Sequence, residues 1–418
     1  MGLQREIDDV MAIDQHAHPM AMGLEPPGDP ERPIQPYDDI YLPLRFRVTN
    51  PEYLDAWAAL WGYAHRDWSL RHLQELMEKK SSTMVKLGQA YDAWVLDQLK
   101  IEQMVAVSVV PSDKLPPPRF RWCAHLDWML WPFLLQEPTD NAVAKLSVGG
   151  MAQMRESLGC KEPPRNLSDF LSDVMLPMLK FCKERNAVGL KFNTPYYRSL
   201  DFSDVTESDA AAIYLKGVKS GSLRRQEHKV LQDLIFRRLV VAAAAFDLVV
   251  QMHTGIGVGP GFAVAGSNPL LMEPVLLEAK NTKFLLLHLG WPFDNETVSL
   301  LAHENVYVDF SCENVFQSPR ATSKTIVAAL DTFPEKIMYG TDAYSDCSIS
   351  KLCGVPIRAN PLAGWEEKAW LLDRAGRQAV GLALQSLFDD GRITAGRATE
   401  LVQMVMRDNA IKLYGLTR

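Results

Sequence analysis

The sequence has few cysteines, and none of them stand at metal-binding or redox spacing. Its 418 residues contain six, far apart and mostly inside apolar runs: Cys123, Cys160, Cys182, Cys312, Cys347 and Cys353. No C-x-x-C pair occurs, so neither a disulfide framework nor a zinc ribbon is indicated. This use of cysteine fits a reducing compartment, and we expect a cytoplasmic protein.

The sequence also lacks an excess of basic residues and a long apolar run. Lys and Arg total 44 against 51 Asp and Glu, which gives a net charge of −7. Surfaces that bind nucleic acid or anionic membranes need a basic footprint. The longest apolar stretch, 239–250, contains Asp247 and is too short to cross a bilayer. The N-terminal residues carry charges where a signal peptide needs an apolar core. We therefore expect a small-molecule substrate and no nucleic-acid or membrane partner.

No Gly/Ser-rich linker or low-complexity tract divides the chain, and we expect one domain over residues 1–418. Eight apolar runs of strand length occur, each ending in polar or turn residues: 10–14, 104–110, 121–126, 187–192, 248–252, 284–287, 306–310 and 337–339. Continuous apolar runs are typical of strands that are buried on both faces of a parallel sheet.

Helical segments separate many of these runs. Residues 223–246, 269–280 and 296–304 precede the fifth to seventh main strands, and residues 365–413 are predicted to be helical apart from a turn at 389–392. Strands alternating with helices predict an α/β protein, a (β/α)₈ TIM barrel. A barrel of this kind needs ~250 residues. The surplus falls into enlarged loops at 19–99 and 127–186 and a helical C-terminal extension at 361–418.

Metal-competent side chains stand at the carboxyl ends of four predicted strands. His16 and His18 follow the first run, and side chains at i and i+2 of a strand share a face, so both can hold one ion. His253, His288 and Asp342 end three later runs. In a parallel barrel these ends share one rim, where active sites lie. Each could instead be structural: a loop histidine, a core histidine or a helix-capping aspartate.

The ordered set resembles the amidohydrolase superfamily of metal-dependent barrels. His288-Leu-Gly-Trp-Pro, Tyr339-Gly-Thr-Asp342-Ala and Asp408-Asn-Ala-Ile-Lys-Leu-Tyr414 are similar to its "amidohydrolase 2" branch, which includes domains sometimes fused to glutamine synthetase. The resemblance implies that His16, His18, His253 and Asp342 bind a divalent metal. It also implies that His288 binds a second ion or contacts the reacting group, and that Asp342 accepts a proton from water.

Lys191, on the fourth main strand, has three interpretations. Some members of the superfamily carry a carboxylated lysine there that bridges two metals; otherwise the ammonium pairs with a substrate carboxylate or forms a salt bridge in the barrel mouth. Two dications need more anionic ligands than the sequence offers, so we expect one ion. Zinc suits three imidazoles and a carboxylate, and manganese or iron also fits.

Further residues of the rim are candidates for substrate binding: Asn193, Tyr196, Arg198, Trp291 and Glu313. Arg198 could clamp a carboxylate or remain a solvated loop residue, and Trp291 could simply seal the barrel top. His125 lies near the end of the third strand, beside Asp127. The aromatic residues between Tyr53 and Trp68 form either a wall for an aromatic substrate or, as we prefer, a packing helix.

These features predict a metal-dependent hydrolase in which metal-activated water attacks an amide, lactone or other ester carbonyl of a small molecule. The alternative is a non-hydrolytic, metal-dependent decarboxylase of an aromatic or related carboxylic acid, a chemistry that also occurs in this branch. A third possibility is a barrel that binds a metabolite without catalysis. The apolar helices of the extension permit a homodimer.

Overall fold

Eight parallel strands form the centre of the protein. The computed structural model describes residues 3–19, 43–47, 49–137, 150–151, 164–255, 257, 262–344 and 362–416. The strands follow one another in the order β1-β2-β3-β5-β7-β8-β9-β10, and all neighbouring pairs are parallel. Their bounds are β1 (Ala12–Ala17), β2 (Ile101–Ser108), β3 (Phe120–His125), β5 (Ala187–Phe192), β7 (Val249–Met252), β8 (Phe284–Leu286), β9 (Val306–Asp309) and β10 (Ile337–Met338).

The last strand meets the first, which closes the barrel. His18 forms a parallel bridge with Tyr344, and the His18 amide donates to the carbonyl of Ala343 at 2.8 Å. The Asp342 amide donates to the carbonyl of His16 at 2.7 Å. The predicted (β/α)₈ barrel is therefore confirmed. Every predicted strand is present, with its ends displaced by at most a few residues.

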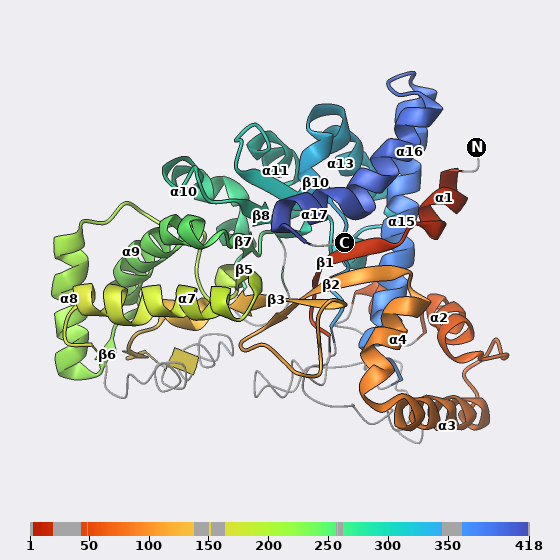
Figure 1. Ribbon diagram of the computed structural model, residues 1–418, viewed down its shortest axis with the longest axis horizontal. Coiled ribbons are helices and arrows are strands. Elements are labelled where there is room, and N and C mark those ends of the chain that lie inside the picture. The colour runs from red at the N-terminus through yellow and green to blue at the C-terminus, as the bar shows by residue number, and fades with distance from the viewer. Residues whose placement is uncertain are drawn as a thin grey trace.

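Helices surround the barrel (Figure 1). The described helices are α1 (Leu3–Asp9), α2 (Glu52–Trp61), α3 (Leu70–Leu87), α4 (Tyr91–Gln98), α6 (Leu167–Phe170), α7 (Leu176–Glu184), α8 (Glu207–Ser220), α9 (Arg225–Ala243), α10 (Glu273–Glu278), α11 (Asp294–Leu300), α12 (Glu313–Phe316), α13 (Pro319–Thr332), α15 (Trp365–Asp389), α16 (Ala395–Gln403) and α17 (Asn409–Tyr414). Two short strands, β4 (Leu134–Leu135) and β6 (Ser222–Leu223), form a separate sheet. The helical C-terminal region is confirmed, and none of the described helices could span a membrane.

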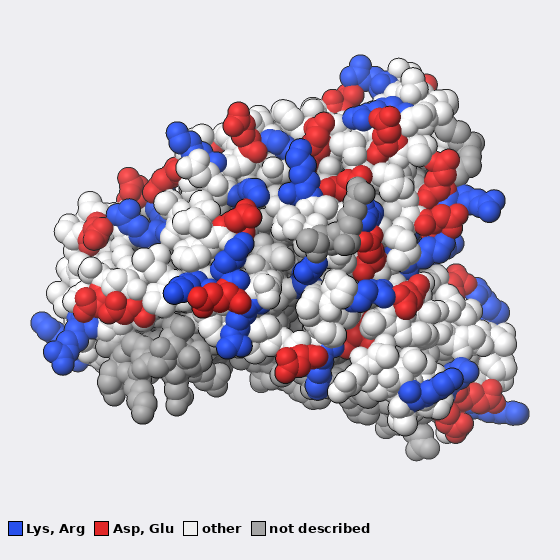
Figure 2. All heavy atoms as spheres, in the orientation of Figure 1, with Lys and Arg blue, Asp and Glu red and all other residues white. Residues whose placement is uncertain are grey.

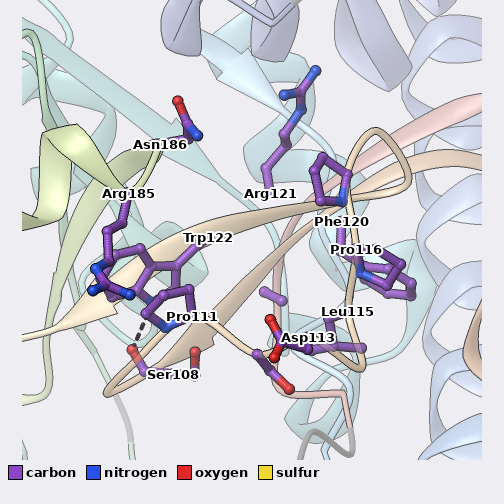
Figure 3. Close-up of a pocket in the computed structure, with 13 residues that line it drawn as sticks. Ser108, Pro111, Asp113, Leu115, Pro116, Phe120, Arg121, Trp122, Arg185 and Asn186 are labelled. Carbon is purple, nitrogen blue, oxygen red and sulfur yellow. Dashed lines mark hydrogen bonds between the residues drawn. The ribbon is translucent and has the colours of Figure 1, made fainter.

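The strand–helix alternation fails once. Residues 109–119, between β2 and β3, hold no helix, because the segment is short and contains four prolines. A groove of about 250 Å³ remains on the outer face of these strands, lined by Pro111, Pro116, Trp122 and Arg185 among others (Figure 3). It lies outside the barrel, and none of the histidines is among the residues that line it.

The predicted loop at 19–99 contains α2, α3 and α4, and its residues 20–42 and 48 lie outside the described residues. Residues 138–149 and 152–163 of the predicted loop at 127–186 also lie outside them. Tyr53, Trp57 and Trp61 of α2 are buried in one apolar cluster with Trp365 of α15. This burial matches the packing helix that we preferred over a substrate wall. The described cysteines Cys123, Cys182 and Cys312 are free thiols.

Candidate metal centre

The first and last strands bring three metal-competent side chains together. One ligand atom each from His16, His18 and Asp342 lies within 4.8 Å of the others, and this is the one such group among the described residues. Nε2 of His16 is 3.2 Å and Nε2 of His18 3.3 Å from Oδ1 of Asp342. The rim of the barrel therefore holds a compact set of two imidazoles and a carboxylate.

The hydrogen bonds of His16 define which of its ring nitrogens is free. Its Nδ1 lies 3.0 Å from Oε1 of Gln251, an atom that only accepts, so Nδ1 carries the proton. Nε2 is buried without a hydrogen-bond partner and turns its lone pair toward the Asp342 carboxylate. Burial lowers the pKa of His16 to about 3, so the ring is neutral at pH 7. A lone pair facing an anionic oxygen is the arrangement that a bound cation stabilises.

The charge state of Asp342 also fits a cation site. Burial alone would raise its pKa, but its position among the imidazoles of His16, His18 and His288 outweighs burial and lowers the pKa well below the usual value. The carboxylate is therefore ionised at neutral pH. Asp342 has a φ of 55° and His288 a φ of 66°. Residues other than glycine rarely adopt this left-handed backbone conformation, and those that do tend to lie at functional sites.

Asp14 fixes the position of Asp342 from the neighbouring strand. Its Oδ1 accepts from the Thr341 amide at 2.9 Å, and its Oδ2 accepts from the Thr341 hydroxyl at 2.5 Å. Burial raises the pKa of Asp14 to about 7, and the bonds from Thr341 oppose that shift. Sequence reasoning did not assign a role to Asp14 or Thr341, although both lie within two residues of predicted ligands.

His253 and His288 form a second histidine pair beside the first group. Nδ1 of His288 lies 2.9 Å from the Ser311 carbonyl and therefore donates, so its Nε2 accepts from Nδ1 of His253 at 3.1 Å. Nε2 of His253 is then a buried lone pair without a hydrogen-bond partner. Nε2 of His288 is 4.0 Å from Oδ2 of Asp342. His253 stands outside the compact group, and its role as a fourth ligand stays a prediction.

Lys191 is buried in the barrel mouth, where its Nζ has no hydrogen-bond partner. It lies in register with His125 on one side and Gln251 on the other. Burial lowers the pKa of Lys191 to about 8. An unpaired buried ammonium can bind an anionic group or lose its proton, so the substrate and second-metal interpretations both stay open.

Asn193 and Tyr196 lie at the rim. Nδ2 of Asn193 is 3.2 Å from Nε2 of His125, which is itself 2.7 Å from Oδ2 of Asp127. The ring of Tyr196 lies against His253, with centroids 4.8 Å apart. Tyr196 therefore lies against His253, whereas Asn193 contacts His125, and the substrate-binding role of both residues stays a prediction.

The other predicted substrate residues are placed differently. The structure does not bring Arg198 into the group of His16, His18 and Asp342, and its guanidinium instead pairs with Asp233 at 2.7 Å. Trp291 stacks on Phe316 with ring centroids 5.8 Å apart, beside the rim loops. Glu313 is buried, its carboxylate accepts from Gln317, and burial raises its pKa well above the usual value. A protonated Glu313 would donate a hydrogen bond to a ligand rather than attract a cation.

A parallel barrel with a compact His-x-His and Asp group at its carboxyl rim is the architecture of a metal-dependent barrel protein. Residues 196–416, more than half of the chain, match the model of the family described as Amidohydrolase. The chain belongs to this amidohydrolase family.

Three known proteins show how far this likeness extends. A protein of Lactobacillus casei that is described as a metal-dependent hydrolase superposes with a TM-score of 0.66 at 18% identity. The superposition covers 99% of this chain and 97% of that protein. The uronate isomerase of Thermotoga maritima superposes with a TM-score of 0.68 at 16% identity, over 99% and 96%. Protein fluG of Emericella nidulans is 22% identical over 264 residues, which are 60% of this chain and 27% of fluG. The chain thus spans well under a third of that relative, and the two structures establish the fold alone.

Proposed function

We propose that the protein is a metal-dependent hydrolase that adds water to the carbonyl carbon of a small amide, lactone or other ester. The observation that supports the proposal most strongly is the group of His16, His18 and Asp342, whose ligand atoms lie within 4.8 Å of one another. We propose one divalent ion there, zinc first and manganese or iron next, with Nε2 of His253 as a further ligand. We also place the protein in the cytoplasm, as its cysteine content predicts.

The residues around this group have separable roles in the proposed reaction. A divalent ion, when bound, lowers the pKa of water from ~15.7 toward ~7 and polarises a carbonyl oxygen. Asp342, ionised and buried, accepts the proton of the attacking water and returns it to the leaving group. His288, with Nε2 4.0 Å from Oδ2 of Asp342, contacts the reacting group. Lys191 offers an unpaired ammonium to an anionic or carbonyl oxygen of the substrate.

A second candidate is the isomerisation of a uronate. The uronate isomerase of Thermotoga maritima and the glucuronate isomerase of Caulobacter crescentus share the fold over 99% and 100% of this chain, with TM-scores of 0.68 and 0.67. Such a reaction moves a proton between neighbouring carbons of a sugar acid, and Lys191 would face the carboxylate. The decarboxylase that the sequence leaves open would release CO₂ instead.

Substrate panels separate these reactions. We expect the zinc-, manganese- or iron-loaded protein to release acid from members of a lactone, ester and amide panel, with no product from uronates or aromatic acids. Asp342→Asn should reduce turnover by at least ~10³-fold because the proton acceptor is lost. Asp233→Asn, a buried carboxylate paired with Arg198, is the matched control and should retain most activity. Formation of a keto-sugar acid from uronates would instead support the isomerase. Release of CO₂ from aromatic acids would support the decarboxylase.

A further inference from the structure

Tyr414 enters the barrel from the end opposite the metal-binding rim. It is the last residue of α17, which packs against β1 and β10 (Figure 1). The ring is buried in the cluster that fills the barrel interior, with Ile13, Val105 and Val249 among its members. A Cβ built on Gly189 of β5 would stand 3.6 Å from the Tyr414 ring, so the strand approaches it closely. The C-terminal helix thus places a hydroxyl inside the barrel.

This hydroxyl is fully engaged by two glutamines of the barrel interior. Nε2 of Gln251 donates to it at 2.7 Å, and it donates to Oε1 of Gln15 at 3.0 Å. Nε2 of Gln251 also donates to the Gln15 carbonyl at 3.0 Å. All three side chains are buried. A ring needed only for its volume would not require the hydroxyl at this position.

One branch of the network leads to a proposed metal ligand. With its amide NH₂ held by Tyr414 and the Gln15 carbonyl, Gln251 turns Oε1 toward His16 and accepts from Nδ1 at 3.0 Å. That bond keeps the proton on Nδ1 and leaves Nε2 bare. Partners of this kind orient metal-binding histidines and fix their tautomer.

A second branch leads to His288. Nε2 of Gln15 donates to Oδ2 of Asp309, and Oδ1 of Asp309 accepts from the His288 amide at 2.7 Å. The backbone of His288 is held here in a left-handed conformation, with a φ of 66°. Tyr414 is therefore the point from which hydrogen bonds reach both histidine groups.

We propose that Tyr414 is a positioning residue, whose hydroxyl holds Gln251 so that His16 presents Nε2 to the ion. The inference rests on the metal centre of the proposed function. Loss of a partner that supports a ligand typically lowers metal affinity 10- to 100-fold. Because Tyr414 acts through Gln251, we expect Tyr414→Phe to weaken Zn²⁺ binding about tenfold, measured on the metal-free protein by competition with a chromophoric chelator.

A matched control is Tyr339→Phe. The Tyr339 hydroxyl is also buried and donates to Asp373 at 2.6 Å, on the side of α15, with no bond to Gln15 or Gln251. The Co²⁺-loaded protein gives a second readout, since its visible absorption reports ligand geometry. We expect the Co²⁺ spectrum to change in Tyr414→Phe and to stay as in the parent protein in Tyr339→Phe.

A double-variant comparison separates positioning from general loosening of the core. If the hydroxyl acts through Gln251, adding Tyr414→Phe to Gln251→Met should cause little further loss of affinity. If the parent protein binds Zn²⁺ and the two variants Tyr414→Phe and Tyr339→Phe have equal affinities and spectra, the inference about Tyr414 is wrong. The proposed metal centre would then still hold. A parent protein that binds no Zn²⁺ would instead overturn the proposed metal centre, and the inference with it.

Discussion

At the scale of single residues, two helical glycines differ in their surroundings. A Cβ on Gly217 of α8 would lie 2.4 Å from two ring carbons of Phe133, whereas a Cβ on Gly396 of α16 would meet nothing within 4 Å. Phe133 is itself buried and packs edge-on against Tyr214, with ring centroids 4.9 Å apart, so it has little room to move. Alanine normally favours a helix over glycine by up to ~1 kcal/mol.

We therefore expect Gly217→Ala to lower the free energy of unfolding by ~1–3 kcal/mol, because overpacking outweighs helix propensity. Gly396→Ala should raise it by a few tenths to ~1 kcal/mol. Urea denaturation followed by circular dichroism gives both values. A gain of stability in both variants would show that Phe133 moves aside.

At the scale of elements, the first turn of α15 carries an unusual buried charge cluster. Glu366 and Glu367 are both buried, and Nζ of Lys80 from α3 lies 3.6 Å from one and 2.6 Å from the other. The Glu367 side chain also accepts from the Gly364 amide, which begins the helix. One ammonium therefore faces two carboxylates. Burial, followed by the charge of Glu367, raises the pKa of Glu366 to about 7.

This shift predicts a pH-dependent stability. The pKa of Glu366 rises from 4.5 in the unfolded chain to about 7 in the fold, so the folded protein holds the proton more tightly. The stabilisation is complete below pH 4.5 and is lost as the pH rises to about 7. Glu366→Gln cannot ionise, so its stability relative to the parent should increase over this range, by at most roughly 3 kcal/mol.

Thermal unfolding of both proteins between pH 4.5 and 8 measures that difference. Glu400→Gln removes a carboxylate that is exposed and pairs with Arg397, and it should show no such trend. A constant difference between Glu366→Gln and the parent across the range would contradict a proton on Glu366.

At the scale of the whole molecule, the parallel barrel explains why so much could be predicted. His18 and Asp342 stand at opposite ends of the sequence, yet carboxyl ends of parallel strands share one rim, so the chemistry was readable from strand ends. The hydrogen-bonded residues inside the barrel could not be predicted in this way. Gln15, Gln251 and Tyr414 meet only because β1, β7 and α17 converge inside the barrel, and no local pattern encodes that meeting.

Other features could not be predicted from the sequence for similar reasons. Arg198 follows β5 as a substrate residue would, but its partner Asp233 comes from α9, a contact that spacing does not show. The helix expected after β2 is absent because prolines fill the connection. Apolar periodicity locates strands and helices well, whereas side-chain partners depend on the packing of distant elements.

The rim joins the first and last strands, so metal binding and folding of the whole barrel should be coupled. His16 and His18 lie on or beside β1, and Asp342 follows β10. An unfolded chain does not hold these donors together, so Zn²⁺ binds the folded state and stabilises it by RT ln(1 + [L]/Kd). At a free Zn²⁺ concentration of about 1,000 Kd the gain is ~4 kcal/mol.

We expect the midpoint of thermal unfolding to rise with Zn²⁺ in the parent protein. Asp342→Asn should lose most of that rise, because one of the three clustered donors loses its charge, whereas Asp331→Asn, at an exposed pair with Arg392, should keep it. An equal rise in Asp342→Asn and the parent would place the ion elsewhere on the protein.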